Sequence, residues 1–253
     1  MLASELTPLM ILALTLVAFV AGYISSIAGA GGLITLPILL WFGLPPINAL
    51  ATNKVQSALG TLSSSWNFFR KGYINFTEIR YSVLLALIGS ICGTLLAQNI
   101  GDEVLFKLMP IMLIVIAVYF LVSPRISDDS SIARLSTLPF GLLVALPMGV
   151  YGGFFGPGMG SIFPFLFVCL SGYGLSKATA QTKVMILGIN GISALLFAFH
   201  GDVFWELALY MSVAQIIGAR LGSNRVIKQG AGLIQPLIIG VTLVLALKLL
   251  LFS

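Results

Sequence analysis

Charged side chains are scarce in this sequence. Only 8% of its 253 residues are Asp, Glu, Lys or Arg, whereas 58% are hydrophobic and the mean hydropathy is +1.08. A soluble domain needs roughly 25% charged residues to cover its surface. Apolar runs of about twenty residues, the length that crosses a bilayer, recur along the whole chain. The sequence therefore predicts an all-α integral membrane protein.

Histidine and cysteine are rarer still, with one and two residues respectively. No zinc-ligand, phosphate-loop or Ser-His-Asp pattern occurs, so we expect no metal, no other cofactor and no enzymatic activity. The 13 Lys and Arg residues give a formal charge of +5. Most of them fall in short loops, where retention on the cytoplasmic side explains them better than nucleic-acid binding. We expect the lipid bilayer, and no nucleic acid, as a partner.

Carboxylates are absent from the interiors of the predicted spans. Proton-driven pumps and cation carriers commonly need Asp or Glu within the membrane, and divalent cations favour carboxylate ligands. The sequence therefore favours an anion over a cation as the transported species. All eight acidic residues lie in loops or at span ends: Glu5, Glu78, Asp102, Glu103, Asp128, Asp129, Asp202 and Glu206.

The polar breaks divide the chain into two halves of five apolar elements each. We predict a first repeat over residues 1–123, a cytoplasmic linker over 124–136 and a second repeat over 137–253. Each half has four elements long enough to cross the membrane and one short element, which gives about eight full spans and two broken or re-entrant helices. The predicted elements are Leu9–Ala28, Leu33–Phe42 (short), Ala49–Phe69, Tyr81–Ala97 and Val104–Val122, then Leu138–Phe155, Ser161–Leu170 (short), Lys177–Phe199, Val203–Leu221 and Leu233–Leu251.

The second half repeats the first at the level of single residues. Lys54 corresponds to Lys183, an offset of 183 − 54 = 129. Such self-similarity at a fixed offset indicates a duplicated unit. The same offset pairs identical residues at Gly43 and Gly172, Ala49 and Ala178, Val55 and Val184, Phe68 and Phe197, Gly72 and Gly201, Tyr81 and Tyr210, Gly89 and Gly218, and Gly93 and Gly222.

Equivalent loops of the two halves carry opposite charge. The loop with Arg70, Lys71 and Arg80 corresponds to one with His200, Asp202 and Glu206, and the loop with Asp102 and Glu103 corresponds to one with Arg225 and Lys228. Because basic loops stay in the cytoplasm, equivalent loops should lie on opposite sides of the membrane. The sequence therefore predicts an inverted five-plus-five repeat, as in many secondary transporters.

A glycine cluster precedes the short element in each half. Non-helical backbone at membrane depth is tolerated where it is buried in protein or lines a wet cavity. A helix that begins after such a break directs unpaired N–H groups and its positive dipole end at an anion. The alternative is that the glycines only permit close helix packing. The clusters are Gly29 to Gly32 and Gly156 to Gly160.

The two equivalent lysines lie inside predicted spans. A charge at such a position is usually functional or paired, although a lysine can also extend, or snorkel, toward the interface. Hydroxyl and amide side chains around both lysines favour a hydrated anion site over a lipid-facing position. The candidate substrate-binding residues are therefore Gly29, Gly31, Gly32, Thr52, Asn53, Lys54, Gln56, Ser57, Gly156, Gly158, Gly160, Gln181, Thr182, Lys183 and Asn190.

These segments resemble the sulfite exporter TauE/SafE family of membrane permeases. The resemblance rests on two runs with paired glycine-rich and lysine-containing segments: SSIAGAGGLITLPILLWFGLPPINALATNKVQSALGTLSSSWNFFRKGYINF, and GGFFGPGMGSIFPFLFVCLSGYGLSKATAQTKVMILGINGISALLFAFHGDVFW. It implies a multi-pass carrier in a bacterial or archaeal cytoplasmic membrane that exports sulfite or another small sulfur-containing anion. The second run departs from the first where Thr182 replaces Asn53 and Met185 replaces Gln56.

We therefore predict a secondary transporter, an exporter of a small anion such as sulfite or an organosulfonate. The substrate would bind at the repeat interface, and alternating access would rock one repeat against the other. The alternatives are an anion channel, or a permease for another small organic anion. The sequence leaves open the coupling ion, which could be a proton or sodium, and whether the protein forms a homo-oligomer.

Overall fold

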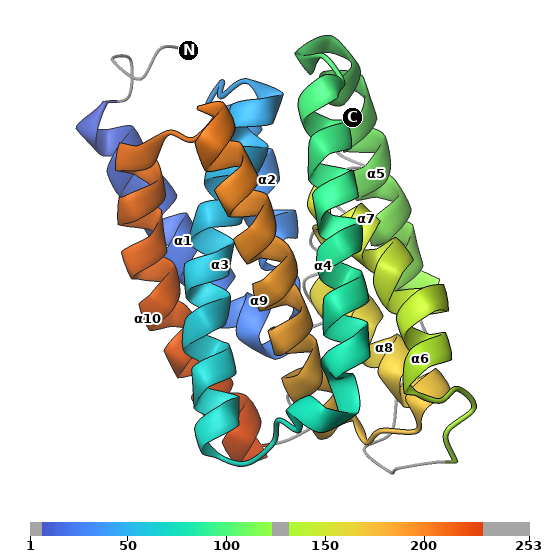
Figure 1. Ribbon diagram of the computed structural model, residues 1–253. Helices are drawn as coiled ribbons and strands as arrows, with labels where there is room; N and C mark the ends of the chain where they lie inside the picture. Colours follow the sequence, from blue (N-terminus) through green and yellow to red (C-terminus); the bar gives the residue numbers. More distant parts are fainter. Residues whose placement is uncertain (1–6, 123–131, 230–253) are drawn as a thin grey trace.

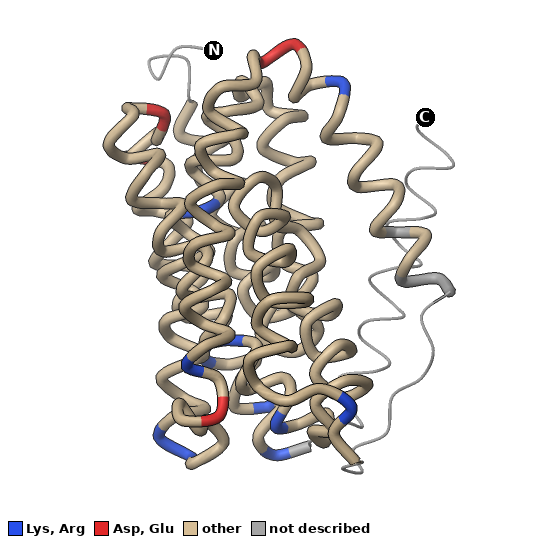
Figure 2. Tube along the Cα trace, turned by 45° about the vertical axis from the view of Figure 1, so that its right-hand side comes forward, with Lys and Arg blue, Asp and Glu red and all other residues tan. Residues whose placement is uncertain are grey.

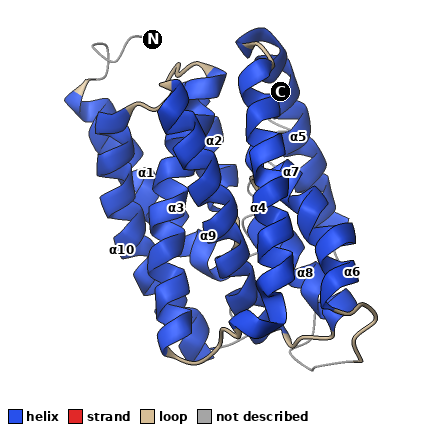
Figure 3. Ribbon diagram, viewed as in Figure 1, coloured by secondary structure: helices blue, strands red, loops and turns tan. Residues whose placement is uncertain are grey.

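The computed structural model describes residues 7–122 and 132–229, and all regular secondary structure within these two ranges is helical (Figure 3). The predicted all-α fold is confirmed for these residues. The predicted span Leu233–Leu251 and most of the predicted linker lie outside them. The elements are α1 (Pro8–Ala28), α2 (Gly31–Trp41), α3 (Pro46–Arg70), α4 (Phe76–Asn99), α5 (Asp102–Val122), α6 (Thr137–Phe140), a π-helical turn η2 (Gly141–Ala145), α7 (Leu146–Phe154), α8 (Met159–Ser171), α9 (Leu175–His200) and α10 (Trp205–Gln229).

Four helical stretches are long and apolar enough to cross a bilayer: α1, α4, the continuous run Thr137–Phe154 and α9. Large apolar side chains are exposed on outer helix faces, including Leu9 on α1, Leu84 on α4 and Val213 on α10. Contiguous exposed apolar surface of this kind is unfavourable in water and suits lipid tails. The described fold is that of a membrane-embedded protein.

Local capping moves several helix starts away from the predicted bounds. Helix α3 begins at Pro46, three residues before the predicted Ala49, because proline suits the first helical turn. Helix α4 begins at Phe76 rather than Tyr81, since Asn75 caps it by accepting the N–H of Thr77 at 3.1 Å. Helix α10 continues to Gln229, well past the predicted Leu221.

Both predicted glycine breaks are present. Helix α1 ends at Ala28, where Gly29 takes a left-handed conformation (φ 69°), and α2 begins two residues later. In the second half α7 ends at Phe154, and Gly156 (φ 100°) and Gly158 (φ 87°) precede α8. An L side chain would be strained at these left-handed positions, so glycine is required there.

Helices of the two halves pack on each other in a crossed arrangement. A Cβ at Gly93 of α4 would lie 2.0 Å from the Val150 carbonyl oxygen of α7, and one at Gly222 of α10 would lie 2.3 Å from that of Tyr23 in α1. Gly93 and Gly222 are 129 residues apart in sequence, and each contacts the first helix of the other half. The fourth element of each half therefore packs against the first helix of the other half at small-residue contacts.

Helices α3 and α9 are neighbours in the middle of the bundle and run in opposite directions (Figure 1). In the same view α4 runs upward and α10 downward. Equivalent helices of the two halves thus point opposite ways in the described residues.

Charge is distributed unevenly between the two ends of the bundle. Figure 2 shows Lys and Arg gathered at the lower end, whereas most Asp and Glu lie at the upper end. The basic end contains Arg70, where α3 ends, and Lys228, near the end of α10. At the acidic end, Asp102 accepts the backbone N–H of Ile47 at 3.0 Å.

Candidate functional site

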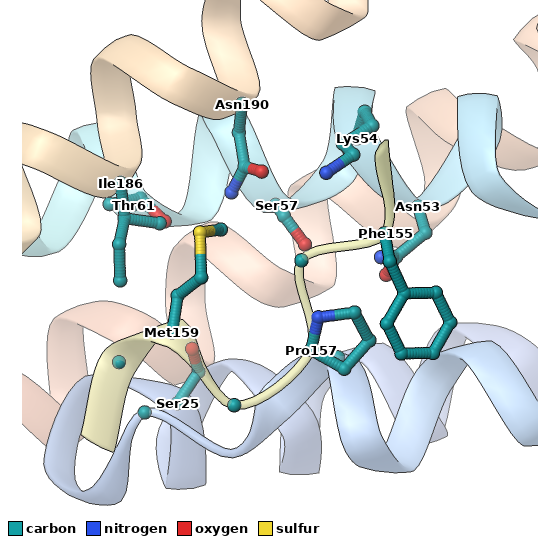
Figure 4. A pocket seen from close by; sticks show the side chains of 15 residues that line it. Ser25, Asn53, Lys54, Ser57, Thr61, Phe155, Pro157, Met159, Ile186 and Asn190 are labelled. Atoms are coloured by element: carbon teal, nitrogen blue, oxygen red, sulfur yellow. The ribbon is translucent and has the colours of Figure 1, made fainter. Parts of the chain in front are cut away.

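A small polar cavity lies where α3, α9 and the two glycine breaks meet (Figure 4). Its volume is about 30 Å³. A single water needs roughly 10–15 Å³ by this measure, so the cavity has room for about two. Nine of the predicted site residues line it: Gly29, Gly32, Asn53, Lys54, Ser57, Gly156, Gly158, Gly160 and Asn190.

Two helices begin at this cavity without a side-chain cap. Ala30 precedes α2 and Gly158 precedes α8, and neither offers a side-chain acceptor to the first N–H groups of its helix. The positive ends of both helix dipoles are therefore close to the cavity. The two breaks also touch, since a Cβ at Gly32 would lie 3.3 Å from the Cα of Pro157.

Lys54 is buried in the middle of α3, with 1% of its surface exposed. Its Nζ donates a hydrogen bond to the carbonyl oxygen of Gly152, in the last turn of α7. The C-terminal end of a helix carries partial negative charge, so an ammonium is favourable there. Gly156 leaves space for this ammonium, because a Cβ at that position would lie 2.7 Å from Nζ.

Lys183 makes the corresponding contact in the other half. It is 2% exposed, and its Nζ donates to the carbonyl oxygen of Ser25, in the last turn of α1, at 2.6 Å. The two acceptors hold corresponding places, because Ser25 lies four residues before the left-handed Gly29 and Gly152 lies four residues before the left-handed Gly156. Each lysine thus binds the end of the first helix of the opposite half. Both ammonium groups are thus held inside the protein, and neither side chain extends along its own helix toward the interface, as snorkelling would require.

The predicted residues that do not line the cavity have other environments. Gln56 donates to the Asn53 side-chain oxygen at 3.0 Å, and Thr52 accepts the N–H of Phe204 at 3.3 Å. Gln181 donates to the carbonyl of Asn75 at 3.3 Å. Two more are packed within the protein: Gly31, against Ser25, and Thr182, whose buried hydroxyl has no partner in the described part of the chain. Lys183 lines an adjoining cleft, which shares Ser25, Thr61 and Ile186 with the cavity.

The sequence analysis missed six residues that line the cavity. Thr61 is the equivalent of Asn190 and Ile186 is the equivalent of Ser57, so the repeat offset of 129 could have found both. No sequence signal singled out Ser25 and the apolar residues at the second break. The missed residues are Ser25, Thr61, Phe155, Pro157, Met159 and Ile186.

Metal-binding side chains do not gather at this cavity. Within residues 7–122 and 132–229, no three His, Cys, Asp or Glu side chains lie close enough to hold a metal ion. The groups that face the cavity are an ammonium, hydroxyls, amides and backbone N–H groups, and this combination suits an oxyanion.

Comparison with known proteins identifies the family of the chain. The family model "Sulfite exporter TauE/SafE" matches residues 14–249, which include both glycine breaks and both lysines. The chain belongs to the sulfite exporter TauE/SafE family. The resemblance noted in the sequence is thereby confirmed.

Two curated relatives resemble the chain over nearly its whole length. The probable membrane transporter protein YfcA of Escherichia coli (strain K12) is 40% identical over 96% of this chain and 91% of its own length. A probable membrane transporter protein of Haemophilus influenzae is 42% identical over 92% of this chain and 91% of its own length. A more distant relative, probable membrane transporter protein MJ0441 of Methanocaldococcus jannaschii, is 28% identical over 83% of this chain. No solved structure matches the chain significantly.

Proposed function

We propose that this protein is a secondary transporter that exports a small oxyanion, sulfite or an organosulfonate, through the central cavity. The family and the relatives support a membrane transporter, and the substrate and mechanism are our proposal. The observation that carries it is the buried Lys54 ammonium in a cavity with two uncapped helix starts. The described Asp and Glu residues all lie at or near helix ends, so none of them lines the cavity, where it would repel an anion.

The hydroxyl and amide groups of the cavity support an oxyanion rather than a halide. Ser57, Thr61 and Asn190 line the cavity, and in the described residues their side chains make no hydrogen bond. Oxyanions accept several directional hydrogen bonds, which such donors can supply. A sulfonate or sulfite would bind between the free donors and the helix starts.

We further propose an inverted five-plus-five repeat with about eight full spans. Three observations support it. Equivalent helices run in opposite directions (Figure 1), equivalent glycines make equivalent crossed contacts, and Lys54 and Lys183 bind equivalent carbonyls. The basic end of the bundle (Figure 2) would face the cytoplasm by the positive-inside rule. With relatives in bacteria and an archaeon, the cytoplasmic membrane is the proposed location.

Transport would proceed by alternating access. A cavity of about 30 Å³ is smaller than one sulfur with three oxygens needs, so the surrounding helices must separate for the anion to enter or leave. Around the cavity, the two halves meet at the α3–α9 contact and at the glycine breaks, where a rocking motion would open one side and then the other. A channel would instead need an open path through the protein.

Binding can be tested on the purified full chain by thermal unfolding in a panel of anions. A ligand that binds only the folded state stabilises it by about 2.7 kcal/mol at a concentration of 100 times its dissociation constant. We expect sulfite or methanesulfonate to raise the midpoint, and chloride at equal ionic strength to leave it unchanged. An absence of stabilisation by every sulfur oxyanion would contradict the proposed substrate class.

A further inference from the structure

We infer that Lys54 alone supplies the ammonium that binds the anion, and that Lys183 is a positioning residue that holds the end of α1 in place. The inference rests on the proposed function, because it assigns roles within the same site. The two lysines occupy equivalent positions of the sequence repeat, and both are buried and bound to equivalent carbonyls. Their surroundings differ in three ways.

The first difference is access to the cavity. Lys54 lines the central cavity together with its neighbour Asn53, and in Figure 4 its ammonium lies near the second glycine break. Lys183 does not line the central cavity but an adjoining cleft of only about 10 Å³, which shares Ser25, Thr61 and Ile186 with it. An anion in the central cavity can therefore reach the Lys54 ammonium directly.

The second difference is the set of polar groups on each lysine's own helix. One turn after Lys54, the Ser57 side chain lines the cavity, whereas the equivalent residue on α9 is the apolar Ile186. One residue before Lys54, Asn53 lines the cavity, whereas the equivalent Thr182 does not. Helix α3 thus presents a lysine, an amide and a hydroxyl to the cavity, and α9 contributes Asn190 from farther along.

The third difference is the group that lies against the glycine break after each of these helix ends. The end of α1 is held by backbone contact, since a Cβ at Gly29 would lie 2.0 Å from the carbonyl carbon of Gly160. Ser161 also donates from its hydroxyl to the Ala28 carbonyl. The end of α7 is held by α4 instead, since Thr94 donates to the Gly153 carbonyl at 3.3 Å and a Cβ at Gly153 would lie 2.2 Å from the Ser90 carbonyl oxygen. At Gly156, however, the nearest neighbour for an added Cβ is the Lys54 ammonium itself.

These contacts give the two ammonium groups different roles. Lys54 can exchange the Gly152 carbonyl for an anion without displacing another backbone segment, because residues 155–160 line the cavity beside it. Lys183 adds a second hydrogen bond to the Ser161 bond and the Gly29–Gly160 packing contact that fix α1, so its removal would loosen the site without removing a ligand of the anion.

The experiment measures sulfite affinity and unliganded stability on the same purified full chain. Lys54→Gln and Lys183→Gln are matched variants, because each removes one buried charge and keeps an amide donor. Sulfite is titrated against the thermal unfolding midpoint. We expect Lys54→Gln to weaken the apparent affinity at least about tenfold, since a charge-assisted hydrogen bond to the anion is lost. We expect Lys183→Gln to lower the unliganded midpoint but to keep the affinity within about threefold of wild type.

Equal losses of affinity in the two variants, or a larger loss in Lys183→Gln, would overturn the inference and leave the proposed function standing. A wild-type chain that neither sulfite nor methanesulfonate stabilises would instead overturn the proposed function, and this inference with it. If Lys183→Gln does not fold, Lys183→Arg takes its place, since it keeps a charged donor for the Ser25 carbonyl. It should bind sulfite as wild type does, and a tenfold loss in this variant would contradict the assignment.

Discussion

Replacing Gly29 with alanine should destabilise the protein strongly, because two independent costs fall on this position. The residue has φ 69°, and an L side chain in the left-handed region costs about 1–2 kcal/mol. In addition, the new Cβ would lie 2.0 Å from a backbone carbon of Gly160. No rotamer change can relieve a contact between backbones, so α1 and α8 must separate, which costs about 1–3 kcal/mol as overpacking does.

The sum is about 2–5 kcal/mol. At roughly 2–4 °C per kcal/mol for a chain of this size, thermal unfolding of the purified protein should begin roughly 4–20 °C lower. Because Gly29 also lines the central cavity, the variant should lose anion-dependent stabilisation as well.

Two control substitutions separate the costs. Gly72→Ala has the conformational cost alone, since φ is 76° and nothing lies within 4 Å of the added Cβ. Gly160→Ala has the steric cost alone, because this helical glycine would place its Cβ 2.3 Å from the Cα of Gly29. If Gly29→Ala proves no more destabilising than Gly72→Ala, the close approach of the two breaks is refuted.

Two further predictions concern the cavity and the crossed helix contacts. Ser57→Ala and Asn190→Ala should each reduce sulfite transport in proteoliposomes while the chain stays folded, because neither side chain makes a hydrogen bond within the described residues. Wild-type transport in both would remove them from the site. Gly93→Ala and Gly222→Ala should each lower the unfolding midpoint by forcing helices apart, and Gly191→Ala is the matched control, since its Cβ meets nothing within 4 Å. Equal midpoints in all three variants would contradict the crossed packing.

Much of the fold could be predicted because hydropathy and glycine positions are local signals. The break after Ala28 and the short helix that follows it were predicted within two residues. Helix starts were less accurate, since capping by Asn75 and the preference for Pro46 in a first turn extend α4 and α3 beyond their apolar cores. Polar caps such as Asn75 and prolines such as Pro46 are also typical of loops, so a search for apolar runs places both outside the helix.

The sequence could predict many of the residues that line the candidate site, but not the groups that their side chains contact. The repeat offset identified Lys54 and Lys183, and few other charged residues lie inside the predicted spans. Their acceptors could not be predicted, because the Ser25 and Gly152 carbonyls are backbone groups that any residue would supply. Which lysine lines the cavity likewise depends on how the two halves pack, and that is a property of tertiary contacts alone.

Counterflow in proteoliposomes tests the central claim most directly. Vesicles that contain the purified chain are loaded with unlabelled sulfite and diluted into a trace of radiolabelled sulfite. A carrier that exposes one site alternately to each side exchanges the two pools, so labelled sulfite should accumulate transiently above its equilibrium level. The account predicts this overshoot in wild type and its loss in Lys54→Gln. A conductance without overshoot would indicate a channel, and the absence of any sulfite flux in wild type would contradict the proposed function.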